Sequence, residues 1–363
     1  MPGAAIRLQG PRLALLQSAA LRQALLIFTA AGVLGLLILL SLRTGPVELT
    51  NAQVLQSLWN AITFADIQGQ SDWVVRELRL PRTLLAVLIG AGLAAAGAVT
   101  QGVFRNPLAD PGLIGVASGA ALAAVAVIVL KDSLLAFWVV VMGPLALPIA
   151  AFLGGLAVTL VIYRLGTRNG QTQVATLLLA GVAINVLTGA LTGILTYMAD
   201  DQALRSMTFW SMGSLAHGRW PEIAALSICI ILPLCFLPRF ARLLNALLLG
   251  EAVATHLGYR VQQAKLWLIA AAALMVGAGV AVAGMIGFIG LVVPHLLRLL
   301  IGPDHRALLP ASVLLGASLL LIADMIARTW LAPADLPVGL VMAVIGGPVF
   351  LSLLLQQVKH NRG

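Results

Sequence analysis

The feature that most constrains this chain is a series of long apolar runs, each ended by a short cluster of polar, Gly or Pro residues. About ten runs can be traced, and most approach the ~20 residues that a helix needs to cross a bilayer. Pro144 and Pro148 predict a kink in the fourth run, and the eighth is too short for a full crossing. The runs cover about residues 23–42, 82–104, 113–130, 134–163, 174–198, 221–237, 266–284, 292–301, 308–330 and 338–356.

Composition supports a membrane protein. Hydrophobic residues make up 60% of the 363 positions and charged residues 10%, whereas soluble domains have about 45–50% and about 25%. A soluble enzyme, a disordered chain and a disulfide scaffold are therefore excluded. Lipid offers no partner to backbone groups, so the runs are predicted to be helices. We expect an all-α polytopic membrane protein in which residues 1–363 form a single transmembrane domain and the first run is retained rather than cleaved.

The distribution of charge predicts the orientation. With ten crossings both termini lie on one side, and that side carries fourteen basic residues against three acidic ones, Asp110, Glu251 and Asp304. The basic residues are Arg7, Arg12, Arg22, Arg105, Arg164, Arg168, Arg239, Arg242, Arg260, Lys265, Arg298, Arg306, Lys359 and Arg362. Lys and Arg collect on cytoplasmic loops, so both termini are expected in the cytoplasm. The net charge of +9 then reflects orientation in a membrane and does not indicate nucleic acid.

An internal repeat is also visible. Residues 90–108 align without gaps on residues 277–295, with seven identities in 19 positions. The first copy crosses inward and the second outward, so the repeat is predicted to be inverted, as in many transporters. Each copy is followed by a short element interrupted by Gly or Pro, which is a pointer to a transport path.

Two stretches, 43–81 and 199–220, are predicted to lie outside, and the second has room for one short helix. The first ends in RELRLPR (76–82), a basic cluster on the side where basic residues are scarce. It is interpreted as a docking surface for an acidic partner, or alternatively as arginines that reach lipid headgroups or pair with nearby acids. Arg328 could join this surface, or pair with Asp324 four residues earlier.

The longest inner loop, 238–265, is interpreted as two short helices under the membrane. It could be a socket for a cytoplasmic partner or an interfacial amphipathic helix that contacts headgroups. Ionisable residues are nearly absent from the predicted midplane, which argues that the transport energy comes from a separate subunit. A secondary transporter with inverted repeats remains the alternative from another class. The sequence shows no Walker A motif, no catalytic residues and no metal-ligand spacing.

Several motifs resemble those of the FecCD or BtuC-like permeases, the membrane subunits of bacterial ABC importers for cobalamin, iron-siderophores and haem. The similarity covers about residues 20–357. The motifs are RELRLPR (76–82), QGVFRNPLADPGLIG (101–115), FWSMGSL (209–215), GEAVATHLG (250–258), GFIGLVVPHLLRLLIGPDHRALLP (287–310), LAPADLPVG (331–339) and IGGPVF (345–350).

The resemblance implies a type II importer: a permease homodimer in the bacterial inner membrane, two cytoplasmic ABC ATPase subunits and a periplasmic binding protein. The permease binds no permanent cofactor, and the partner subunits use ATP. In this scheme 238–265 is the cytoplasmic coupling segment, and 43–81 and 199–220 are periplasmic.

The resemblance also assigns roles to individual residues. Arg79, Arg82 and Arg328 match the positions that dock the binding protein. The ATPase is contacted by Gly250, Glu251, Ala254, Leu257, Gly258 and Arg260. The gates and the path involve Asn106, Leu108, Thr172, Asn185, Thr188, Thr192 and Thr196.

The stretch TYMADDQALR (196–205) is most similar to that of haem-importing members, so haem is the expected substrate. A ferric siderophore and cobalamin are the alternatives. Thr, Gly and Ala dominate the predicted lining, which suits an importer that must release its cargo.

Overall fold

The computed structural model describes residues 10–216, 218–332 and 334–360. Its centre is helix α4 (Leu80–Phe104), which is buried almost without interruption from Ile89 to Phe104. This stretch is rich in Gly and Ala, so neighbouring helices approach its backbone closely. A Cβ added at Gly90 would lie 2.4 Å from the carbonyl oxygen of Gly316 on α14 (His305–Thr329). The small-residue surface of α4 therefore sets the packing of the whole bundle.

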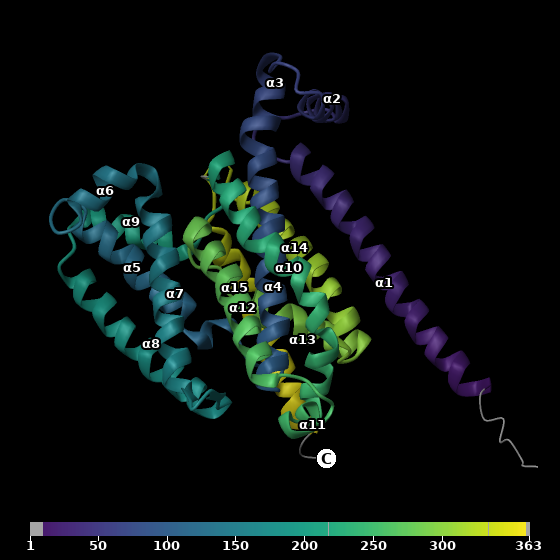
Figure 1. Cartoon of the computed structure of the whole chain (residues 1–363). Coiled ribbons are helices and arrows are strands. Elements are labelled where there is room, and N and C mark those ends of the chain that lie inside the picture. The colour runs from purple at the N-terminus through teal and green to yellow at the C-terminus, as the bar shows by residue number, and fades with distance from the viewer. Residues whose placement is uncertain (1–9, 217, 333, 361–363) are drawn as a thin grey trace, which may run out of the picture.

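Most of the other helices lie around α4 in two groups, while α2 and α3 stand apart at one end of the bundle (Figure 1). One contains α5 to α9, and the other contains α10 to α15 together with α1 at its edge. The bounds of the first part are α1 Gly10–Arg43, α2 Asn51–Ile62, α3 Gly69–Trp73, the π-helix η1 Val74–Arg79, the 3₁₀ turn η2 Pro111–Ile114, α5 Val116–Leu130, α6 Ala136–Met142, η3 Gly143–Leu145, α7 Ala146–Gly166, β1 Thr167–Arg168, β2 Gln171–Thr172 and α8 Val174–Tyr197. The remainder is α9 Asp201–Met212, α10 Trp220–Leu248, α11 Glu251–His256, α12 Val261–Ala283, α13 Ile289–Ile301 and α15 Val338–His360.

The membrane-spanning segments agree with the sequence. Among the described residues, seven helical stretches are long and apolar enough to cross a bilayer, and three shorter apolar helices, α5, α13 and α15, complete the set of ten. The prediction of an all-α polytopic protein with about ten such segments is confirmed. The shortness of the segment that begins near residue 292 is confirmed too, because α13 has 13 residues.

Two details of the prediction were wrong. The run 134–163 is broken rather than kinked, because Gly143 adopts a φ of +53° and Pro144 starts a new turn, so α6 and α7 are separate. The loop 238–265 does not form two short helices, since α10 continues through Pro238 to Leu248. Leu244 and Leu247 are fully buried there, and this packing outweighs the hydrogen bond lost at proline. Only α11 is a separate short helix.

The two copies of the repeat form neighbouring antiparallel helices. Leu85, near the start of α4, lies against Gly218, while Ala283, at the end of α12, accepts a hydrogen bond from Ser214 N. Both helices end in a residue with a positive φ, Arg105 after α4 and Gly284 after α12. Each is then followed by a short irregular stretch and a shorter helix. The inverted repeat therefore has a direct structural counterpart.

Candidate functional site

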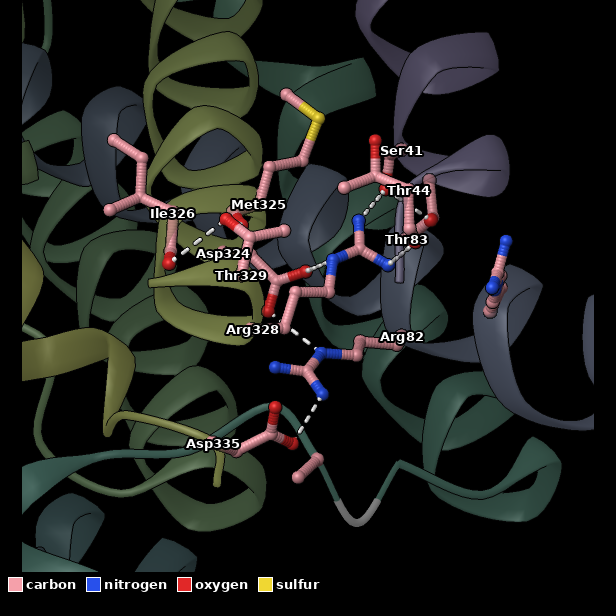
Figure 2. Close-up of polar contacts among 12 residues, drawn as sticks. Ser41, Thr44, Arg82, Thr83, Asp324, Met325, Ile326, Arg328, Thr329 and Asp335 are labelled. Atoms are coloured by element: carbon pink, nitrogen blue, oxygen red, sulfur yellow. Dashed lines mark hydrogen bonds and ion pairs between the residues drawn. The ribbon is translucent and has the colours of Figure 1, made fainter. Parts of the chain in front are cut away.

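At one end of the bundle, Arg82 lies between two carboxylates (Figure 2). Its Nε donates to Asp324 Oδ1 and its Nη1 to Asp335 Oδ2, each at 2.8 Å. The Asp324 side chain is fully buried, whereas that of Asp335 is 40% exposed. Arg82 lies in the first turn of α4 and Asp324 belongs to α14, so the pair joins two helices distant in sequence. Asp335 is carried by the loop between α14 and α15.

Arg328 lies one turn beyond Asp324 and completes this outer ionic cluster, which we define as Arg82, Asp324, Arg328 and Asp335. The Nε of Arg328 is 3.4 Å from Asp324 Oδ2, and its Nη2 donates to Ser41 Oγ at 2.6 Å. The two cations and two anions balance, which offsets the cost of burying charge. Only 4% of the Arg328 side chain is exposed.

Arg79 is separate from the cluster and binds backbone. It is buried and donates to the carbonyl oxygens of Leu42, Arg43 and Val47. Gly45 passes so close that an added Cβ would lie 2.9 Å from Arg79 Nη2. The guanidinium thus fastens the end of α1 to the start of α4. The structure brings Arg82 and Arg328 together, and all three arginines are engaged within the chain, so their docking role stays a prediction.

At the opposite end, α11 and the residues directly before and after it contain the six positions expected to contact an ATPase. Leu257, Gly258 and Arg260 are exposed, and Gly258 has a φ of +87° with no atom within 4 Å of an added Cβ. Ala254 is fully buried and supports the helix from inside. Gly250 precedes the helix with a φ of +115°. The exposed residues therefore form a short surface, and its ATPase contact stays a prediction.

Glu251, the first residue of α11, turns inward to Lys265. Its Oε1 lies 2.5 Å from Lys265 Nζ, and that lysine has no exposed side-chain surface. The same Nζ donates to the carbonyl oxygen of Thr172 at 3.0 Å. Gln262, one turn earlier on α12, accepts a hydrogen bond from Thr172 N at 2.9 Å. Both backbone groups of Thr172 are therefore held by α12.

This arrangement, which we call the inner joint, consists of Glu251, Lys265, Gln262 and Thr172. Thr172 ends β2, and α8 begins two residues later. The joint thus connects the exposed helix α11 to the start of α8 through a single buried ammonium. A displacement of α11 would be transmitted to α8 because a buried charge cannot be left without its partner at low cost.

Asn106 and Leu108 lie in the loop after α4. Leu108 N donates to Asn106 Oδ1 at 3.0 Å, which closes a tight turn. The loop approaches α11, since the position of a Cβ at Gly250 is 3.9 Å from Arg105 Nη1. Within the described residues, no hydrogen bond joins this loop to Thr172, and the role of the two elements as gates stays a prediction.

The remaining path residues follow one stripe of α8. The Oδ1 of Asn185 accepts a hydrogen bond from Ser118 Oγ of α5 at 2.6 Å, so the stripe begins against a neighbouring helix. The hydroxyls of Thr188, Thr192 and Thr196 each donate to the carbonyl four residues earlier, at 2.8–2.9 Å. These hydroxyls are already satisfied within the helix, and their place in the path stays a prediction.

A different face of α8 is exposed and apolar. It includes Val182, Val186 and Ile194, with exposed fractions of 55%, 69% and 58%. Gly189 and Gly193 lie with them and have no atom within 4 Å of an added Cβ. In this structure the open face of α8 is therefore lined by aliphatic side chains and glycines rather than by the threonines.

Sequence reasoning missed Lys265 and Asp335. Lys265 was counted among inner basic residues, although a cation at the start of an apolar helix with Glu251 in the preceding segment was a detectable signal. Asp335 stands in a Pro-rich loop, and its pairing with Arg82, 253 residues away, depends on the tertiary fold. No group of three or more His, Cys, Asp or Glu side chains able to hold a metal occurs among the described residues.

Comparison with known proteins places the chain in a transport family. The FecCD transport family matches residues 33–356. The hemin transport system permease protein of Yersinia pestis is 50% identical over 313 residues, which cover 85% of this chain and 90% of that protein. The cobalamin import system permease protein of Halobacterium salinarum is 43% identical, covering 82% of this chain and 79% of that protein.

A vitamin B12 import system permease protein of Escherichia coli O157:H7 is 44% identical, covering 79% of this chain and 85% of that protein. A solved structure of a metal-chelate type ABC transporter in an inward-facing conformation superposes with a TM-score of 0.78 at 31% identity. The match covers 91% of this chain and 98% of that one.

Proposed function

The chain belongs to the FecCD transport family, and on that premise we propose that it is the membrane-spanning subunit of an ABC importer that carries haem into the cytoplasm. The resemblance seen in the sequence motifs is thereby confirmed. The observation that supports haem is the 50% identity to a hemin permease along 90% of that protein's length, against 42–44% for the cobalamin permeases. Cobalamin is the second candidate, and a ferric siderophore the third.

In this proposal the permease does not hydrolyse ATP. Two copies of a cytoplasmic ABC ATPase would supply the energy and contact α11 together with the exposed residues that follow it, Leu257, Gly258 and Arg260. The position of α11 supports this role, because it is a short exposed helix outside the spanning segments and is tied to α8 by the inner joint. Movement of the ATPase subunits would reach α8 by that connection.

We further propose a homodimer in which the two copies of α8 face each other across the path. The support is the exposed aliphatic face of α8, which carries Val182, Val186 and Ile194. This face would offer haem weak apolar contacts and the exposed backbone of Gly189 and Gly193. Such a surface would let the flat macrocycle pass without binding its iron strongly. The dimer is expected in the bacterial inner membrane with both termini in the cytoplasm.

A periplasmic binding protein would deliver haem at the end that carries the outer ionic cluster. Of the three arginines expected to dock it, Arg82 is the best placed, because its partner Asp335 is 40% exposed. An acidic side chain of the binding protein could take the place of Asp335. Arg79 and Arg328 would act mainly by holding α1, α4 and α14 in position for this exchange.

The test is uptake by proteoliposomes that contain the permease with its ATPase and binding protein. We expect ATP-dependent accumulation of haem, with little accumulation of cyanocobalamin or a ferric siderophore. Uptake of cyanocobalamin in preference to haem would overturn the assignment of haem as the substrate, while the assignment of the chain to an ABC importer would stand. Uptake that needs no ATPase subunit would overturn the importer itself.

A further inference from the structure

A groove with a volume of about 450 Å³ runs between α10 and α12, within the spanning part of both helices. Its shape follows from the sequence of α12. Trp267 and Leu274 are two turns apart on one face, about 10 Å along the axis. Ala270 and Ala271 lie between them and leave a notch. Across the notch, Pro233 weakens the backbone hydrogen bonding of α10.

The walls of the groove are apolar. On α10 it is lined by Leu232, Phe236 and Phe240, which extend over about 12 Å. Leu232 and Phe236 are 52% and 49% exposed, and Trp267 is 65% exposed. One leaflet of the hydrocarbon core is about 15 Å thick. The groove therefore has the polarity and length to hold one lipid acyl chain along a single leaflet.

A cation is fixed at the rim of this groove. The guanidinium of Arg239 lies 5.0 Å from the centroid of the Phe236 ring, and its Nη1 donates to the carbonyl oxygen of Cys235 at 3.2 Å. No carboxylate in the described part of the chain forms an ion pair with Arg239. Trp267, whose amphipathic indole suits the membrane interface, lies on the opposite wall. The rim thus combines positive charge with an interfacial aromatic ring.

The position of the rim selects the leaflet. From Arg239, α10 continues for about two and a half turns to Leu248 and then leads to α11, on the side to which the surplus of basic residues was assigned. An anionic headgroup in that leaflet would meet Arg239 while its acyl chain lies against Phe236 and Ala271. A zwitterionic headgroup would occupy the same groove without the net attraction.

We propose that the α10–α12 groove is a binding site for an anionic phospholipid of the cytoplasmic leaflet, with the headgroup at Arg239 and one acyl chain between Phe236 and Trp267. The site is independent of the cargo. Arg242 offers a matched control, because it is also exposed on α10 but lies about 150° around the helix from the centre of the groove-lining residues.

The experiment uses the full permease in vesicles of phosphatidylcholine or of phosphatidylcholine with phosphatidylglycerol, in which one lipid at a time carries brominated chains. Bromine quenches a tryptophan that it contacts, and the difference between the wild type and W267F isolates the signal of Trp267. We expect brominated phosphatidylglycerol to occupy the groove about fivefold more readily than phosphatidylcholine, as one cation beside an anionic headgroup would give. R239Q should lose this preference, and R242Q should keep it.

Equal quenching by both lipids in the wild type would overturn the proposal, as would a preference that R239Q leaves unchanged. If R242Q lost the preference as well as R239Q, the preference would be due to the general positive charge of the surface, and the proposal would also be overturned. Absence of quenching at Trp267 by either lipid would mean that no acyl chain lies in the groove and would also overturn the proposal. R239Q replaces an exposed side chain, so we expect it to fold normally. Thermal unfolding can verify this before the lipids are compared.

Discussion

Glu251→Ala tests how much the ion pair between Glu251 and Lys265 in the inner joint contributes to the stability of the fold. Lys265 has no exposed side-chain area and is held by Glu251 at 2.5 Å and by the carbonyl oxygen of Thr172 at 3.0 Å. Removing the carboxylate leaves a buried cation with one neutral partner. Breaking a buried ion pair in this way costs about 3–5 kcal/mol. The Glu251 side chain is 30% exposed, so we expect a value near the lower end, about 3 kcal/mol.

Substitution of the partner residue, Lys265, should lower the stability by less. Lys265→Met removes the buried charge itself and leaves Glu251, which can reach water, and the Thr172 carbonyl oxygen, which loses a donor. One unsatisfied buried acceptor costs about 1–3 kcal/mol. The double variant E251A/K265M leaves no buried charge and should be more stable than E251A alone. Glu48→Ala removes an exposed carboxylate far from the joint and should change stability by less than about 0.5 kcal/mol.

The assay is reversible unfolding in mixed detergent micelles, followed for the four variants under the same conditions. A parallel measurement compares ATP hydrolysis with uptake in the assembled transporter. We expect E251A to retain hydrolysis while uptake falls, because the link from α11 to α8 is loosened. If K265M is less stable than E251A, or if the two losses simply add in the double variant, the buried-charge reasoning is refuted.

Three further predictions concern single positions. Asp324→Asn should cost about 3–5 kcal/mol of stability, because two buried guanidiniums would lose their central carboxylate, and thermal unfolding measures this loss. Gly258→Trp should leave the isolated permease folded but uncouple ATP hydrolysis from uptake, since Gly258 is exposed and an added Cβ meets no atom within 4 Å. Asp335→Asn should tighten docking of the binding protein severalfold at low salt, because Arg82 would be released for the partner's carboxylate.

Each of these has a matched comparison. Asp335→Asn serves as the control for Asp324, and a stability loss above about 1 kcal/mol for this 40% exposed group would contradict the assignment of the buried charge. Gly258→Ala carries the same backbone strain as the Trp variant without its bulk, so equal uncoupling by both would point to strain rather than to an ATPase contact. If the binding protein had the same affinity for the Asp335 variant as for the wild type at every salt concentration, Arg82 would not be part of the docking surface.

The spanning segments could be predicted because a bilayer allows a backbone few structures. Lipid requires internally satisfied hydrogen bonds, so apolar runs had to be helices, and their number and approximate places were read correctly. The ends of α10 and the break between α6 and α7 could not be read in the same way. Pro238 suggested a helix end, but buried Leu244 and Leu247 extend the helix past it.

The site shows the same division. Local motifs identified α11 and the basic segment that contains Arg79 and Arg82, because those features are continuous in sequence. The partners of these residues were not predictable, because they come from distant elements, as with Asp335 for Arg82 and Thr172 for Lys265. The threonines of α8 share a helical stripe, yet sequence periodicity does not say which stripe faces the bundle. Contact with Ser118 of α5 decides that question for Asn185.

The proposed function requires that this chain form the path for haem and that a separate ATPase drive the transport. The most direct measurement is the initial rate of haem uptake in proteoliposomes that contain permease, ATPase and binding protein, with and without ATP. We expect ATP-dependent haem uptake that exceeds cyanocobalamin uptake and disappears when the ATPase subunit is omitted. Equal uptake without ATP, or transport of cyanocobalamin in place of haem, would contradict it.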